Sequence, residues 1–374
     1  MTDQASEQRS DTGKILISCY ENDVPFFLEA ELEQLYGSMY SSLAQFRIYS
    51  ADKDTSTYIV RQDGKAITIF LFQRENNRVQ VVNEVIEVSE EEVDRFAAYV
   101  FNTFPWAGLI TFKAVRTDIR RLRYPFQRFN YLEDIVLSLP DSAEEYLAML
   151  GKNTRRNIKR YTKRLQEKFP SVEYGVCVQD EIDAETIFDI ADLNRARMAD
   201  KSKVSSIDRE EAERIYRLAR DCGLVGVIKI DGRICAGGIS YRIGSNYFLS
   251  VIAHDPRYDD YWLGILCCYL TICECIARGG KEFHFLWGRY DYKFTLLGVK
   301  RDLDNLAIYR SRTGLLLNMG VAFKIAFKGY LRLATLWLQD AKHKNNFASR
   351  LAIVTMNRVR GWRRVRKSVA VERK

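Results

Sequence analysis

The pattern of apolar and polar positions in the second half of the chain predicts three consecutive β-strands. Residues 225–230 and 234–241 are β-rich runs joined by Asp-Gly at residues 231–232, and a glycine that tolerates positive φ suits the tight turn of a hairpin. Residues 247–253 form a third run, which stops at His-Asp-Pro, residues 254–256, because proline cannot donate to a strand ladder. We expect a loop that carries chemistry to begin there.

A nearly continuous apolar run over residues 262–277 predicts a buried helix, because it leaves almost no polar face. The loop of residues 258–264 leads into this helix. Its free backbone N–H groups and the positive end of the helix dipole would form a site for an anion such as the pyrophosphate of coenzyme A. The alternative is an ordinary helix start that binds nothing.

The first half of the chain repeats this order of elements. Residues 58–72 predict a second hairpin with Asp-Gly at residues 63–64, and residues 78–88 predict its third strand. Ser89, followed by three glutamates, begins a predicted helix, and residues 109–112 predict a strand. The shared order predicts a duplication, the alternative being a chance likeness of two common hairpins. Because the three glutamates would repel a pyrophosphate, we expect the second repeat to carry the cofactor.

Composition places the chain among ordinary globular proteins. Its 374 residues are 47% apolar and 28% charged, which allows two domains and excludes a disordered chain. Residues 1–13 are polar and lack an apolar segment, so we expect them to be disordered and not to form a signal peptide. No stretch reaches about 20 uninterrupted apolar residues, so we predict no membrane-spanning helix and a cytoplasmic protein.

The eight cysteines are expected to be reduced thiols, because no export signal is present. Four of them, Cys267, Cys268, Cys273 and Cys275, lie on the predicted buried helix and point in different directions. Four ligands cannot converge on one ion from that spacing. We therefore predict small buried side chains and no metal.

Two segments are strongly basic. Residues 151–165 carry only positive charges, and Arg155, Arg156 and Lys159 fall within about one helical turn, where they could hold a phosphate of the substrate or form a solvated face. Residues 311–374 contain 15 Lys and Arg against 2 Asp and Glu. Their pattern predicts an amphipathic helix that would suit the anionic inner surface of the cytoplasmic membrane or transfer RNA, or would simply pack on the domain.

Three stretches resemble the GNAT-superfamily acetyltransferases associated with cellulose and other exopolysaccharide production, the BioF2-like type. They are the basic helix around residues 153–158, the passage of residues 254–264, and residues 283–288 leading to Tyr-Lys at residues 292–293. The resemblance covers roughly residues 145–310. It implies an α/β (α+β) fold of two GNAT-like domains in tandem, as in Fem-type transferases, each a mixed, mostly antiparallel sheet flanked by helices.

The resemblance also implies a division of the chain and a donor. Residues 14–140 would be a degenerate N-terminal GNAT-like domain, residues 141–310 the catalytic one, and residues 311–374 a basic helical tail. The donor would be an acyl-coenzyme A such as acetyl-coenzyme A, although the passage at residues 261–266 keeps only the first glycine of the superfamily's pyrophosphate loop. His284 stands where the family tends to have an acidic residue.

Candidate site residues follow from this resemblance. Asp255 and His284 are candidate general bases, Tyr292 could protonate the leaving group, and Lys293 could stabilise the oxyanion or hold a phosphate; a core histidine, a turn-capping aspartate, a core tyrosine and a surface lysine are the structural alternatives. Cofactor binding would fall to Tyr261, Trp262, Leu263, Gly264, Ile265 and Leu266. Substrate binding would fall to Arg155, Arg156 and Lys159, with Arg289 and Asp291 as orienting groups.

We therefore predict an acyl-coenzyme A-dependent N- or O-acyltransferase. Its acceptor would bear an amine or a hydroxyl, such as a nucleotide-linked or lipid-linked sugar in cell-envelope or exopolysaccharide biosynthesis. One alternative is a Fem-like transferase that takes an aminoacyl group from transfer RNA. Another is a non-catalytic GNAT-like assembly factor, held at a polysaccharide synthase by its basic tail.

Overall fold

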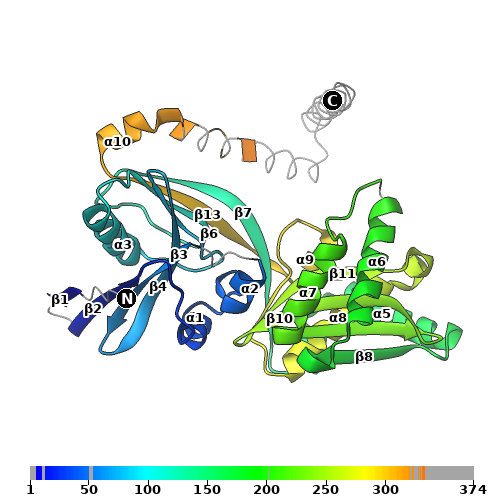
Figure 1. The fold of residues 1–374 in the computed structure, drawn as a ribbon. Coiled ribbons are helices and arrows are strands. Elements are labelled where there is room, and N and C mark those ends of the chain that lie inside the picture. The colour runs from blue at the N-terminus through cyan, green and yellow to red at the C-terminus, as the bar shows by residue number, and fades with distance from the viewer. Residues whose placement is uncertain are drawn as a thin grey trace.

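The computed structural model describes residues 6–10, 13–49, 54–200 and 202–320, and residues 322, 323, 327, 329, 331 and 332. Its first half alternates strands and helices (Figure 1). In chain order these are β1 (Ser6–Ser10), β2 (Gly13–Tyr20), α1 (Leu28–Tyr36), η1 (Met39–Ser41), α2 (Leu43–Ile48), β3 (Thr55–Gln62), β4 (Lys65–Glu75), β5 (Arg78–Val81), α3 (Glu90–Thr103), β6 (Leu109–Val115) and β7 (Phe126–Ser138).

The second half begins with two extra helices and then follows the same order, with a hairpin, a third strand, a helix and further strands. Its elements are α4 (Ala143–Met149), α5 (Lys152–Lys168), β8 (Glu173–Val178), η2 (Gln179–Glu181), α6 (Ala184–Asp200), α7 (Arg209–Cys222), β9 (Gly223–Ile230), β10 (Arg233–Ile243), β11 (Asn246–His254), η3 (Pro256–Tyr261), α8 (Leu263–Ala277), β12 (Glu282–His284), α9 (Asp291–Thr295), β13 (Val299–Tyr309) and α10 (Arg312–Leu317).

Both predicted hairpins are present, and their turns match. Asp63 and Gly64 have φ of 50° and 82°, and Asp231 and Gly232 have φ of 50° and 75°. Two successive positive φ values are what a type I′ turn requires, and the Asp-Gly pair meets that requirement. Among the described strands, each half also has a parallel pair, β5 with β6 and β11 with β12, which confirms the predicted repetition of elements.

In the part of the chain that the structure describes, the two halves share one sheet of 13 strands, in the order β1-β2-β3-β4-β5-β6-β13-β7-β12-β11-β10-β9-β8. β13, from the end of the second half, lies between β6 and β7, and β7, from the end of the first half, lies beside β12. The predicted boundary at residue 140 therefore divides the sequence but not the sheet. Backbone hydrogen bonding joins the halves through the pairings of β6 with β13, β13 with β7 and β7 with β12.

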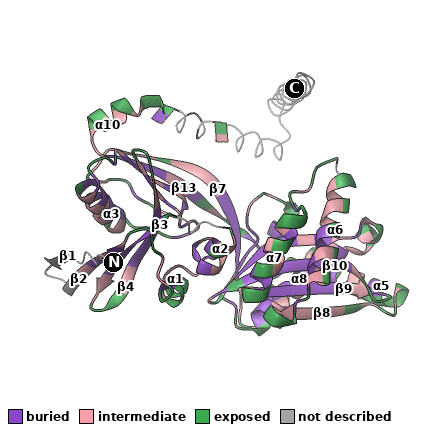
Figure 2. Cartoon of the chain, viewed as in Figure 1, coloured by how far each residue is buried: buried purple, intermediate pink, exposed green. Residues whose placement is uncertain are grey.

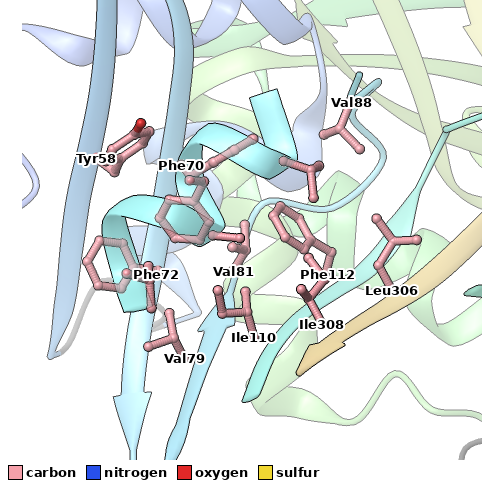
Figure 3. Close-up of a cluster of buried hydrophobic side chains, with 14 of the residues drawn as sticks. Tyr58, Phe70, Phe72, Val79, Val81, Val88, Ile110, Phe112, Leu306 and Ile308 are labelled. Carbon is pink, nitrogen blue, oxygen red and sulfur yellow. The ribbon is translucent and has the colours of Figure 1, made fainter. Parts of the chain in front are cut away.

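Buried residues concentrate on the strands and on the sides of the helices that face them (Figure 2). In the first half, α3 covers a core of packed aromatic rings, in which Phe70 lies 5.2 Å from Phe96 and 5.3 Å from Phe112 between ring centroids (Figure 3). In the second half, α8 fills one core cluster and α6 and α7 fill another. Cys267, Cys268 and Cys275 are fully buried in the α8 cluster, which confirms the prediction of small buried side chains.

The N-terminal segment differs from expectation, and the predicted tail is described only in part. Residues 1–13 were expected to be disordered, but Ser6–Ser10 pairs with β2 as an antiparallel strand, because an edge strand offers backbone partners to a polar segment as readily as to an apolar one. In the predicted tail, residues 312–317 are helical, and residues 333–374 lie outside the described residues. Within the described chain, no helix is both long enough and apolar enough to cross a membrane.

Arg310 ties the end of β13 to the first half. Its guanidinium donates to the carbonyls of Phe101, Phe104 and Ala107 at 2.6–2.7 Å, at and just beyond the end of α3. These carbonyls include helix-end acceptors that have no partner within the helix. The residue therefore satisfies three acceptors across a separation of more than 200 residues in sequence.

We expect Arg310→Ala to lower the free energy of unfolding by about 1–3 kcal/mol, because it leaves partly buried carbonyls without a donor. Urea denaturation measures this change. Arg312→Ala removes the same charge from an exposed residue two positions away and should change stability by less than about 0.5 kcal/mol. Equal losses in the two variants would show that the carbonyl contacts do not contribute.

Candidate active site

The strands β11 and β12 separate after a short stretch of pairing. They are parallel partners only where Asn246–Phe248 faces Glu282–His284. Beyond this point the chain after β12 follows β7, since Phe285 N–H donates to the Ile135 carbonyl at 2.8 Å, while β11 continues toward η3. Leu286 and Gly288 have φ of 57° and 89° and turn the chain away.

A cavity of about 380 Å³ occupies this opening, which we call the splay pocket. One wall is formed by residues 249–252 of β11 and the other by residues 285–287. The pocket is completed by side chains from η1 of the first half, from α6 and the loop after it, and from α9 and its N-cap residue: Tyr40, Asn194, Arg197, Met198, Lys203, Tyr290, Tyr292 and Lys293. A gap between two diverging strands exposes backbone that a bound molecule can contact.

Lys293 is almost fully buried, at 2% exposure, and lies in the wall of the splay pocket. Its ammonium donates to the carbonyls of Phe285, Leu286 and Trp287 at 2.7, 3.1 and 2.6 Å. Burial lowers the pKa of Lys293 to about 8, so it remains mostly protonated at neutral pH. All three N–H groups are used by the loop, which makes Lys293 a residue that shapes the pocket. The expected role as an oxyanion or phosphate donor would require it to release a carbonyl.

Tyr292 also lines the splay pocket, one residue before Lys293 on α9. Its ring packs edge-on against Phe285, with the centroids 6.2 Å apart, and stacks with Tyr290 at 6.3 Å. Burial raises the pKa of the Tyr292 phenol well above its ordinary value of 10.0. The hydroxyl therefore keeps its proton at neutral pH and can donate it.

Three other predicted residues do not line the splay pocket. Asp255 accepts from the backbone N–H of Arg257 at 2.9 Å and pairs with its guanidinium at 2.5 Å, an interaction that lowers the pKa of Asp255. It caps η3, as the turn-capping alternative expects, and it does not line the splay pocket. Arg289 makes two 2.7 Å bonds to Glu133, and Asp291 lies exposed in the first turn of α9.

His284 lies outside the splay pocket, in a second cavity. It is 6% exposed, its Nδ1 lies 2.6 Å from Oδ2 of the buried Asp134, and its ring stacks on Phe248 at a centroid distance of 4.3 Å. Burial lowers the pKa of His284, but the carboxylates of Asp134 and Glu282 outweigh that effect and raise it overall. Sequence reasoning missed Asp134, although an acidic pair followed by the apolar residues 135–137 was a visible signal.

The start of α8 retains the features of an anion site. Within the described chain, no acceptor is recorded for the backbone N–H groups of Leu263 and Gly264, and Trp262 precedes them with φ of 60°. A Cβ at Gly264 would lie 2.4 Å from Nδ1 of His254, whose Nε2 bonds Asp259 at 2.7 Å. Of the six predicted cofactor residues, Leu263 and Leu266 are buried in the core, so cofactor contacts there would come from the backbone.

The basic helix α5 packs beside η3, close to the start of α8. Arg164 lies over the ring of Tyr261 at 4.9 Å. Arg155 donates to a carbonyl of α4 at 3.2 Å, while Arg156 and Lys159 are exposed. The helix therefore brings positive charge to the predicted anion site, but through Arg164, which the sequence analysis did not single out.

A comparison with protein families matches the region that contains most of the splay pocket. Residues 152–294 match the family model described as acetyltransferase (GNAT) domain. The chain contains a GNAT-type acetyltransferase domain and is a transferase. The crystal structure of FemX superposes with a TM-score of 0.60 at 11% identity, covering 77% of this chain and 96% of that chain.

A second solved structure, a conserved protein of unknown function from Bacteroides thetaiotaomicron VPI-5482, gives a TM-score of 0.51 at 13% identity, with 77% of this chain and 98% of that chain covered. At these identities the likeness shows a shared fold. The search of curated proteins found no match. The predicted α/β fold with GNAT-like tandem architecture is confirmed, and the BioF2-like subtype stays a prediction. Among the described residues, no group of three or more His, Cys, Asp or Glu could hold a metal ion.

The buried Lys293 should make stability depend on pH. Its folded pKa of about 8 lies below the ordinary 10.5, so between these values the unfolded chain binds more protons and the free energy of unfolding rises with pH. We expect urea denaturation at pH 7.5 and pH 10 to show this rise, and Lys293→Met to lack it while losing stability at both pH values. Lys159→Met, at an exposed position, should retain the rise. An unchanged pH dependence in Lys293→Met would contradict the assignment.

Proposed function

We propose that the protein transfers an acyl group from acyl-coenzyme A to an amine or hydroxyl acceptor. The splay pocket is the observation that carries this proposal. The pocket lies between two diverging parallel strands of a GNAT-type domain, and η3 leads from the far end of β11 to the start of α8. If the thioester of an acyl-coenzyme A lies in this opening, the pyrophosphate of its coenzyme A would lie near the backbone N–H groups of Leu263 and Gly264 and near Arg164.

The described residues support a simple sequence of steps. The acceptor's lone pair attacks the thioester carbonyl, a C–N or C–O bond forms, and the C–S bond breaks. The departing thiolate takes a proton from the hydroxyl of Tyr292, whose high pKa keeps it protonated until then. The Tyr292 oxygen then takes back the proton that the acceptor's nitrogen or oxygen loses as the new bond forms, which restores the starting state. Lys293 holds the loop of residues 285–287 and thus the shape of the wall that faces the thioester.

The aminoacyl-tRNA alternative has one supporting observation, the basic face of α5. Arg156, Lys159 and Arg160 are exposed, and no acidic partner is recorded for them in the described part of the chain. Such a face attracts a phosphate backbone as well as a coenzyme. An exopolysaccharide-linked acceptor rests on the sequence resemblance alone.

Isothermal titration calorimetry with acetyl-coenzyme A tests the donor. We expect micromolar, weakly salt-dependent binding, and at least a tenfold loss in Ser250→Trp, because Ser250 lines the splay pocket and the indole would fill it. Ser206→Trp, at another exposed serine, is the matched control. An absence of coenzyme A binding, together with steeply salt-dependent binding of bulk transfer RNA, would favour the aminoacyl-tRNA alternative.

Tyr292→Phe tests the proton donor. We expect kcat to fall by a factor on the order of 10²–10⁴, with acetyl-coenzyme A affinity and melting temperature nearly unchanged, because only the hydroxyl is removed. Tyr290→Phe serves as control, since Tyr290 lines the same pocket but is 57% exposed. Equal rates in the wild type and Tyr292→Phe would exclude the role.

We also propose that the basic C-terminal segment binds an anionic lipid surface. Leu316, Leu317, Phe323 and Phe327 are 63%, 88%, 72% and 54% exposed, and residues 311–374 carry a net charge of +13 by sequence. Exposed apolar side chains beside many cations match a membrane with anionic head groups.

Vesicle co-sedimentation tests this attachment. We expect binding to vesicles containing phosphatidylglycerol, weakening with salt, and little binding to pure phosphatidylcholine. Leu317→Glu should reduce binding to these vesicles severalfold. Val204→Glu should not, because Val204 is 98% exposed but lies between α6 and α7, outside the basic segment. Equal binding to both vesicle types would contradict the electrostatic part of the proposal.

A further inference from the structure

The lining of the splay pocket is positively charged. It includes Arg197, Lys203 and Lys293, and no carboxylate among the described residues. The ammonium of Lys293 is occupied by three carbonyls of the loop at residues 285–287. For Arg197 and Lys203, no acidic partner is recorded in the described part of the chain. The proposed acyl transfer, as described so far, uses neither of these two cations.

The register of α6 places Arg197 over β11. The helix packs on β10 and β11 through the buried side chains of Ile187 and Ile190 (Figure 1). Arg197 comes about two turns after Ile190 and therefore lies on the same face of the helix. Its Nη1 is 3.5 Å from the carbonyl oxygen of Ile252, which belongs to the β11 wall of the splay pocket.

The turn that ends α6 brings Lys203 to the same opening. The backbone N–H of Lys203 donates to the carbonyl of Met198, and that of Ser202 donates to the carbonyl of Ala199, both at 2.8 Å. Ser202 has φ of 52°. This is the Schellman arrangement, in which a residue in the left-handed region reverses the chain at a helix end. As a result, Met198 and Lys203 both line the splay pocket.

α6 and α8 cover opposite faces of the sheet. A Cβ added at Gly237 of β10 would lie 2.4 Å from Ile190 of α6, and one added at Gly238 would lie 3.4 Å from Thr271 of α8. Successive residues of a strand point to opposite faces. The cations of α6 and the anion site at the start of α8 therefore belong to different faces of the sheet, and the opening between β11 and β12 leads from one face to the other.

This arrangement decides which part of the donor meets the cations. With the pyrophosphate at α8 and the thioester in the opening, the group beyond the sulfur, which is the acyl chain, faces α6. Met198, Leu249 and Phe285 offer apolar surface to its methylene groups. Burial raises the pKa of the Tyr292 phenol, and the nearby Arg197 guanidinium opposes that rise, which places this cation close to the proposed proton donor.

We infer that the acyl group of the donor ends in a carboxylate, as a succinyl group does, and that Arg197 and Lys203 bind this carboxylate. The inference rests on the proposed acyl transfer and specifies its donor. A guanidinium can donate two parallel hydrogen bonds to a carboxylate, and an ammonium adds a point charge. Transfer then converts the acceptor's amine or hydroxyl into an amide or ester that carries a free carboxylate.

Two stable thioethers test the carboxylate on the full chain. S-(3-carboxypropyl)-coenzyme A and S-butyl-coenzyme A carry chains of equal length that differ only in the terminal group, and neither chain can be transferred. We expect calorimetry to show at least about tenfold tighter binding of the carboxypropyl derivative, because only this derivative gives the two cations an anionic acceptor. Equal binding, or tighter binding of the butyl derivative, would overturn the inference.

Neutral substitutions locate the contact. Arg197→Gln should weaken binding of the carboxypropyl derivative at least about tenfold and that of the butyl derivative less than about twofold. Arg217→Gln removes the same charge from an exposed position on α7, outside the splay pocket, and should change neither affinity. Equal losses for both derivatives in Arg197→Gln would assign this cation to the phosphates of coenzyme A and would overturn the inference.

A charge reversal guards against loss of the fold. Arg197→Glu combined with Lys203→Glu should bind S-(3-aminopropyl)-coenzyme A more tightly than the carboxypropyl derivative, the opposite of the wild-type preference. A misfolded chain would lose affinity for both ligands. An unreversed preference in a variant with the wild-type melting temperature would contradict the contact.

The inference and the proposed function fail in different ways. If free coenzyme A and the butyl derivative bind and the carboxypropyl derivative binds no better, the acyl-coenzyme A donor stands and the terminal carboxylate is wrong. If none of the derivatives binds, free coenzyme A included, both are wrong.

Discussion

The pairing of β13 with both β6 and β7 is the interaction on which both pockets depend. It places the last strand of the second half inside the sheet of the first, and it brings β7 of the first half against β12. With β7 in that position, the chain after β12 has a hydrogen-bonding partner of its own and can leave β11 without exposing unpaired backbone on both sides. The splay is therefore stable because the other repeat supplies a strand.

Local signals in the sequence were sufficient for the elements of each half. The Asp-Gly pairs at residues 63–64 and 231–232 predicted both hairpins, because their requirement for positive φ is met within two residues. The burial of α8 was also predicted from a local signal, because its apolar run leaves almost no polar face. The strand exchange was not predicted, since nothing in β13 distinguishes pairing with β6 from pairing with a strand of its own half.

The same distinction between local and long-range contacts explains which candidate residues could be placed in the splay pocket from the sequence. Tyr292 and Lys293 were found through a short motif, and both line the splay pocket. The role expected of Lys293 depended on what its ammonium contacts, and those carbonyls belong to a loop that only the folded chain brings under it. The pairing of Asp255 with Arg257 was not predicted, because a carboxylate that caps its own turn resembles a free one in sequence. Asp134 is 150 residues from His284, and only the β7–β12 register joins them.

Duplication therefore has a chemical consequence beyond a larger core. A single repeat could form the two parallel strands that diverge, but Tyr40 in the splay pocket and Asp134 in the second cavity, which His284 lines, both come from the first half. The first repeat supplies the carboxylate that orients His284 and, through β7, the partner strand that holds the opening apart. Substitutions that loosen β13 from β7 should then weaken both pockets together, because the alignment of Arg301 with Asp134 and the departure of residues 285–287 from β11 depend on the same strand pairing.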